Sequence, residues 1–130
     1  METKLNTSAF GKNDIRGIFP SAVNSEVFYN AAIGYVRFCL DRFKEKGTLK
    51  RADELCFCVC MDARLHSKEL KDAVINGLTS YGANVIDIGL APTPLGYFSE
   101  FAKIPDEILE GRKINGALII TASHNPAEYN

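Results

Sequence analysis

The chain has 130 residues, the length of one globular domain, and with 46% apolar and 24% charged residues it has the composition of an ordinary soluble α/β protein rather than a disordered one. Its fifteen basic and sixteen acidic residues nearly cancel, which excludes an overall electrostatic attraction to nucleic acid or anionic membranes. No stretch has the roughly 20 apolar residues of a membrane span, and the N-terminus lacks the apolar core of a signal peptide. We therefore expect a single domain over residues 1–130 in a cytoplasmic protein, without nucleic-acid or membrane partners.

The first half of the chain predicts a loop, a long helix and a buried strand. Phe10 to Pro20, "FGKNDIRGIFP", places charged residues between two glycines and predicts a loop that leads into a short strand. Asn24 or Ser25 can cap a helix whose apolar residues recur at helical spacing until Gly47. "ELCFCVCMD" is nearly all apolar, as expected for a strand that is covered on both faces.

The second half alternates helices and strands. Ser67 to Tyr81 predicts a helix that ends at Gly82, and "NVIDIG" predicts the next strand. "LAPTPLGYF" is a proline-marked turn that can start another helix, "KIPDEILEGRK" predicts a short solvated helix, and "GALIIT" predicts the last strand. This alternation predicts an α/β fold with three layers, α/β/α, around a small mixed, mostly parallel sheet. In such sheets ligands gather at the C-terminal ends of the strands.

Three cysteines, Cys56, Cys58 and Cys60, alternate along the second predicted strand and would share one of its faces. A C-x-C-x-C run can indicate metal binding, but the spacing is not that of a zinc site and no second pair of ligands follows. We interpret the three cysteines as small buried apolar side chains.

Ser123 and His124 stand on a tight turn after the last strand, in "TASHNP", where Pro126 keeps Asn125 away from helical angles. A serine there can be a nucleophile, a phosphate carrier, or a turn residue that bonds local backbone. The G-x-S-x-G motif of serine hydrolases is absent. We expect the adjacent His124 to point away from Ser123, which disfavours a hydrolase triad, and His124 can equally be a hydrogen-bonded residue that lines the turn.

Arg16 is the second candidate, because a guanidinium next to Gly17 in a loop suits bidentate capture of a phosphate. The alternative for Arg16 is a structural ion pair with Asp14 or Asp62. Asp62 and Arg64 leave the end of the second predicted strand and can pair with each other or with the first loop, and there we favour a structural role.

Four segments together point to a family. "NDIRG", the Asp-x-Arg after a strand, "NVIDIGLAPTPLGYF" and "GALIITASHNPAEYN" occur in the order and approximate spacing of the first domain of the α-D-phosphohexomutases. From Phe10 to Asn130 the chain resembles the phosphomannomutase/phosphoglucomutase branch of that superfamily, and the T-A-S-H-N-P string is highly specific.

The resemblance implies that Ser123 is phosphorylated and exchanges its phosphoryl group with a hexose phosphate, so that a 1-phosphate and a 6-phosphate interconvert through a bisphosphate. It implies Arg16 and His124 as further catalytic residues, and we expect substrate contacts at Asn13 and Asn125, although many relatives have Tyr at the position of Asn13. Mg²⁺ on an oxygen of the Ser123 phosphate and hexose 1,6-bisphosphate as activator are the expected cofactors.

Other family motifs do not occur in this chain. The D-G-D-x-D-R metal loop is absent, and the lysine often proposed as general base would lie just beyond Asn130. We therefore expect the chain to be the first of four domains of an enzyme, with the other domains as its partners, and to be inactive alone. The alternatives are a stand-alone phosphosugar-binding module without catalysis, a mutase that acts on the substrate of the phosphoglucosamine mutases, or a serine hydrolase.

Overall fold

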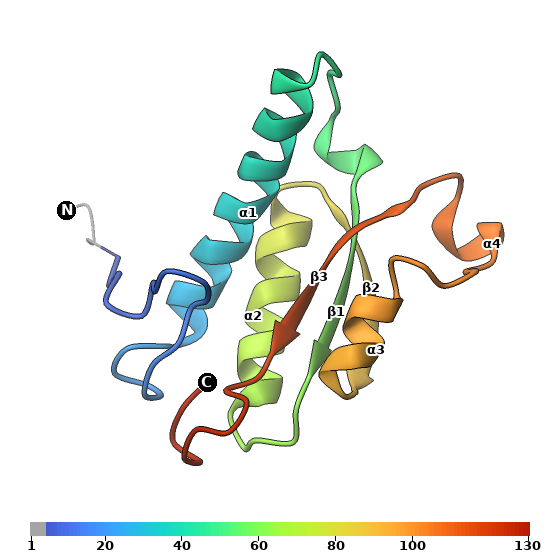
Figure 1. The fold of residues 1–130 in the computed structure, drawn as a ribbon. Helices are drawn as coiled ribbons and strands as arrows, with labels where there is room; N and C mark the ends of the chain where they lie inside the picture. Colours follow the sequence, from blue (N-terminus) through green and yellow to red (C-terminus); the bar gives the residue numbers. More distant parts are fainter. Residues whose placement is uncertain (1–4) are drawn as a thin grey trace.

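A parallel sheet of three strands lies at the centre of the molecule (Figure 1). The computed structural model describes residues 5–130, in which the strands are β1 (Cys56–Met61), β2 (Asn84–Leu90) and β3 (Ile114–Ile120). Their order is β2-β1-β3, and β1 pairs in parallel with both neighbours. The central strand is therefore the one with the most apolar sequence, as burial on both faces and both edges requires.

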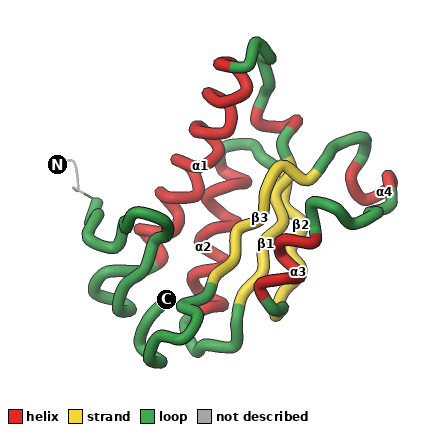
Figure 2. Tube along the Cα trace, viewed as in Figure 1, coloured by secondary structure: helices red, strands yellow, loops and turns green. Residues whose placement is uncertain are grey.

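Helices cover both faces of this sheet (Figures 1 and 2). The long helix α1 (Ser25–Glu45) packs with α2 (Ser67–Ser80) on one face, and the short helix α3 (Thr93–Phe98) lies on the other. A one-turn helix, α4 (Asp106–Leu109), and a 3₁₀ turn, η1 (Ala52–Glu54), lie in the connections. The predicted three-layer α/β/α fold is confirmed.

The main difference from the sequence-based expectation lies before α1, where a short strand was predicted. Between residue 5 and α1 the structure has only isolated antiparallel bridges, Phe10 with Ile15 and Ile18 with Tyr129. Among residues 5–130 the sheet itself is purely parallel rather than mixed. Backbone hydrogen bonds join residues 17–19 of this segment to residues 128–130, and the pairing does not continue through Pro20, which has no N–H to donate.

The predicted limits of the helices are confirmed by their caps. The Asn24 side chain accepts a hydrogen bond from the Val27 backbone N–H at 3.0 Å and so starts α1. Gly82 follows α2 with a φ of +100°, a conformation that glycine adopts without a steric penalty. Gly77 lets the two helices approach closely, since a Cβ there would lie 2.4 Å from the Tyr29 carbonyl oxygen.

The two faces of β1 carry different side chains. Phe57 and Val59 belong to the core cluster on the side of α1 and α2, whereas a Cβ on Gly96 of α3 would lie 3.2 Å from the Cys60 sulfur. Burial raises the pKa of the Cys56, Cys58 and Cys60 thiols. They are fully buried and form no disulfide, which supports their interpretation as small apolar side chains.

Three loops meet where β1 and β3 end (Figure 2). Because the two strands are parallel neighbours, the β1–α2 loop (residues 62–66) and the 121–130 loop that follows β3 leave the sheet side by side. Gly17 joins the N-terminal segment to them by exchanging two backbone hydrogen bonds with Asn130, at 2.9 and 3.0 Å. Within residues 5–130, no helix is both long and apolar enough to cross a membrane.

Candidate functional site

Ser123 is exposed on the 121–130 loop and has a left-handed backbone, with a φ of 55°. Such a conformation costs a residue with a side chain about 1 to 3 kcal/mol, so the surrounding contacts must hold it. Two local hydrogen bonds do so: the Ser123 N–H donates to Thr121 Oγ1 at 3.1 Å, and the Asn125 N–H donates to the Ala122 carbonyl at 3.0 Å.

His124 lies beside Ser123, with Nδ1 2.9 Å from the serine Oγ. The prediction that it points away was wrong. Successive side chains diverge in an extended chain, but the left-handed turn at Ser123 brings these two to the same side. This geometry lets a proton pass between Oγ and the ring. Within residues 5–130 no carboxylate bonds the other ring nitrogen, so a hydrolase triad is incomplete.

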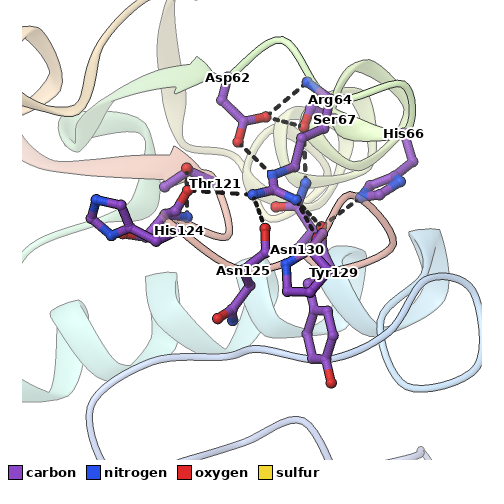
Figure 3. A network of polar contacts seen from close by, with 11 residues as sticks. Asp62, Arg64, His66, Ser67, Thr121, His124, Asn125, Tyr129 and Asn130 are labelled. Carbon is purple, nitrogen blue, oxygen red and sulfur yellow. Dashed lines mark hydrogen bonds and ion pairs between the residues drawn. The ribbon is translucent and has the colours of Figure 1, made fainter.

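The Arg64 guanidinium binds the backbone of the 121–130 loop (Figure 3). Its Nη1 donates to the carbonyl oxygens of Pro126 at 2.6 Å and Tyr129 at 3.3 Å, and its Nη2 donates to those of Asn125 at 2.8 Å and Ser123 at 3.3 Å. The structure thus agrees with a structural role for Arg64. Arg64 binds the backbone of the 121–130 loop in addition to its ion pair with Asp62.

Asp62 fixes Arg64 in turn. One carboxylate oxygen accepts from Arg64 Nε at 3.0 Å, and the other accepts from the Arg64 backbone N–H at 3.1 Å and from Ser67 Oγ at 2.5 Å. Burial alone would raise the pKa of Asp62, but hydrogen bonds led by those from Ser67 and Arg64 outweigh it and hold the pKa below its ordinary value. Asp62 is therefore the charged partner that this arginine needs.

Three further residues complete the support of the loop. His66 Nε2 lies 2.9 Å from the Tyr129 carbonyl oxygen, and the His66 ring stacks on Phe19 at 4.7 Å. The buried Asn130 donates from Nδ2 to Ser67 Oγ at 2.9 Å. Sequence reasoning missed His66, Ser67 and Asn130. The only signal in the sequence was polar residues clustered directly after a fully apolar strand.

Arg16 lies on the neighbouring N-terminal segment, where its Nη2 pairs with Asp14 Oδ2 at 3.0 Å. The predicted alternative of an ion pair with Asp14 is thus present, whereas the ion pair with Asp62 is not. Arg16 and Thr121 line one cavity of about 340 Å³, together with residues of α1 and β3. Ser123 and His124 stand outside this cavity on the exposed loop.

The two predicted substrate-binding asparagines differ in setting. Asn13 is exposed on the N-terminal segment. Asn125 is half-buried on the same loop as Ser123, and its backbone carbonyl is bound by Arg64 while its side chain is not engaged by that arginine. Only Asn125 is therefore brought next to Ser123 by the backbone.

The predicted metal site is not complete in this part of the protein. Across residues 5–130 there is no group of three His, Cys, Asp or Glu side chains that could hold a metal ion. The Asp62 carboxylate is occupied by Arg64 and Ser67.

Comparison with known proteins gives a consistent result. Residues 7–130 match the family model described as phosphoglucomutase/phosphomannomutase, alpha/beta/alpha domain I. A probable phosphoglucosamine mutase of Thermococcus gammatolerans is 38% identical over 121 residues, which are 93% of this chain and 22% of that protein. The phosphomannomutase/phosphoglucomutase of Pseudomonas aeruginosa is 34% identical over 128 residues, 97% of this chain and 23% of that protein.

A solved structure agrees with the sequence relatives. The crystal structure of a phosphoglucomutase/phosphomannomutase family protein from Burkholderia thailandensis superposes with a TM-score of 0.67 and 32% identity, over 90% of this chain and 23% of that one. The chain spans less than a quarter of the length of each of these relatives. With its three-layer fold and the Ser-His turn after β3, the chain belongs to the phosphoglucomutase/phosphomannomutase family, as its alpha/beta/alpha domain I.

Proposed function

We propose that Ser123 is the phosphate carrier of a phosphohexomutase that interconverts hexose 1-phosphates and 6-phosphates. The observation that carries this proposal is the exposed serine on a left-handed turn, with its Oγ 2.9 Å from His124 Nδ1, in a chain of this family. A strained, solvent-facing nucleophile on a rigidly supported loop is what a group-transfer site requires.

The chemistry consists of two opposite phosphoryl transfers. In the first, the bond between phosphorus and Ser123 Oγ breaks, a bond from phosphorus to a sugar hydroxyl oxygen forms, and the hydroxyl proton passes to a base. In the second, after the bisphosphate has turned round, Ser123 Oγ attacks the other phosphoryl group, the bond from that phosphorus to its sugar oxygen breaks, and the sugar oxygen takes up a proton. His124 Nδ1 is placed to give Oγ a proton when it leaves and to accept that proton when it attacks.

The charge on the phosphate requires cations. Phosphorylation adds about −1.5 to −2 charges to Ser123, and Arg16, which lines the same cavity as Thr121, is the proposed arginine for the phosphoryl group. Mg²⁺ on the phosphate of Ser123 would supply further charge neutralisation, with its other ligands outside the described residues. Hexose 1,6-bisphosphate is the proposed source of the first phosphoryl group.

The proposed substrate is a hexose phosphate as a class. The relatives include proteins named phosphoglucosamine mutase and phosphomannomutase at similar identity, 38% and 34%. Asn13 and Asn125 are the proposed substrate contacts within this chain, and the other domains of the enzyme are the proposed partners. In this proposal the enzyme is cytoplasmic, and residues 1–130 alone do not complete the reaction.

Substituting Ser123→Ala in the complete protein tests the proposal. We expect the interconversion of glucose or mannose 1-phosphate and 6-phosphate to fall at least about 1,000-fold, because the nucleophile is lost. Ser21→Ala is the matched control, since Ser21 is an exposed loop serine that bonds only the Ile18 carbonyl through its hydroxyl. Turnover by Ser123→Ala within about tenfold of the original protein would contradict the proposal. An original protein that binds hexose phosphates without turning them over would favour the binding-module alternative.

A further inference from the structure

The hydrogen bonds of Arg64 account for every donor that it has. A guanidinium carries five N–H groups in a planar fork. Nε uses one on Asp62, Nη1 uses two on Pro126 and Tyr129, and Nη2 uses two on Ser123 and Asn125. Arg64 therefore has no N–H group left to donate to a substrate phosphate. An arginine that binds an anion needs such free N–H groups.

The environment of Arg64 explains why these bonds persist. Its side chain is 15% exposed, and the Asp62 side chain is 26% exposed. Asp62 is itself anchored by Ser67 at the start of α2, and Ser67 also accepts a hydrogen bond from the buried Asn130. The Arg64 guanidinium is thus oriented by Asp62 at the end of β1 and by Ser67 at the beginning of α2, independently of its contacts with the 121–130 loop.

Two of the four carbonyls that Arg64 binds belong to the turn at Ser123. Arg64 binds the carbonyl of Ser123 itself and that of Asn125, so the left-handed residue lies within the clamped stretch. Because a peptide unit is planar and trans, fixing the Ser123 carbonyl toward Arg64 turns the His124 N–H to the opposite side. The orientation of the serine and of the following amide thus depends on the same guanidinium.

We propose that Arg64, held by Asp62, is the residue that positions the 121–130 loop and with it Ser123. The inference rests on the proposed function in that the loop positions Ser123 for phosphoryl transfer. Arg64 sets the backbone of residues 123–129 and touches neither the phosphoryl group nor the sugar. Lysine cannot replace it, because an ammonium has three donors without the planar fork and cannot bind four carbonyls and a carboxylate together.

The test compares Arg64→Lys with Arg51→Lys in the complete protein. Arg51 is a matched control, because it also pairs with an aspartate two positions away, Asp53, but lies exposed at the opposite end of the sheet. For Arg64→Lys we expect kcat to fall about 100-fold with KM little changed, since loop misplacement affects the transfer and not substrate binding. Amide hydrogen exchange of Asn125 and Tyr129 should accelerate at least about tenfold. Arg51→Lys should change neither.

A rescue experiment adds a readout that fold damage alone would not produce. In Arg64→Ala, millimolar guanidinium ion should restore part of kcat, and the same ion should leave the turnover of Arg51→Ala unchanged. If Arg64→Ala does not fold, Arg64→Lys decides alone.

The possible failures of the two proposals can be told apart. Unchanged exchange in Arg64→Lys, with or without a loss of kcat, would overturn the positioning role. An original protein without turnover and without phosphate on Ser123 would overturn the proposed function. In that case accelerated exchange in Arg64→Lys would still support the control of the loop by Arg64.

Discussion

Two arginines reach the same end of the sheet, and they differ in what surrounds them. The side chain of Arg16 is 36% exposed and pairs with one carboxylate, that of Asp14, which is itself 51% exposed. The side chain of Arg64 is 15% exposed and gives all of its donors to Asp62 and to four carbonyls of the 121–130 loop. Among the described residues, Arg16 therefore keeps donors for a ligand, whereas Arg64 does not.

This difference shows how the same residue type can serve binding or architecture at one site. Exposed ion pairs contribute little to stability, so Arg16 can exchange Asp14 for an anion at low cost. The Arg64 guanidinium, whose side chain is mostly covered, cannot be released without leaving four carbonyls and one carboxylate unpaired. The number of donors already used, more than proximity to Ser123, distinguishes the two roles.

The largest expected effect is on stability. Replacing Arg64 by Ala leaves Asp62 without its ion-pair partner and four loop carbonyls without their donor, and should lower the free energy of unfolding by about 3 kcal/mol. Arg16→Ala, the matched change at the exposed pair, should lower it by less than about 1 kcal/mol. Urea unfolding of both variants measures the contrast. Equal losses would mean that the two arginines do not differ in the way described.

A smaller effect concerns how the free energy of unfolding depends on pH. The folded state holds the pKa of Asp62 below its ordinary value, so the stability that Asp62 provides is present above about pH 4 and is lost as the pH falls through the lower folded pKa. Asp62→Asn should therefore destabilise the protein at pH 7, and the difference from the original protein should shrink toward pH 2.

Urea unfolding at a series of pH values gives this difference directly. Asp72→Asn serves as the control, because the Asp72 carboxylate pairs with Lys68 on the exposed side of α2. A difference between Asp62→Asn and the original protein that stays constant from pH 7 to pH 2 would show that Asp62 does not act through its charge.

Most of the fold could be predicted because its signals are local. The helical spacing and the Asn24 cap placed α1, glycines marked the ends of helices, and the apolar run of β1 indicated a strand covered on both faces. The last strand begins at Ile114, two residues earlier than "GALIIT" indicated, because Asn115 is a polar strand residue whose Oδ1 accepts the Cys56 N–H at 2.9 Å. Such a partner 59 positions away leaves no pattern in the sequence.

The sequence identified the main residue of the candidate site, but it did not predict how the residues of the site are arranged. Ser123 was identified from its place after a strand, and the family resemblance supplied its role, but the left-handed φ that brings His124 beside it is not encoded by a glycine. The loop contacts of Arg64 depend on β1 and β3 being neighbours, which is a property of the strand order. A single sequence does not reveal that order, so the target of the Asp-x-Arg pair could only be seen in the structure.

The central claim is that Ser123 carries the phosphate. The most direct measurement is the mass of the peptide that contains Ser123, taken from the complete protein isolated from its source, before and after incubation with hexose 1,6-bisphosphate. We predict one phosphate, about 80 Da, on Ser123, present at isolation or gained on incubation, and none on Ser21. A peptide that stays unmodified after incubation with the bisphosphate would contradict the account.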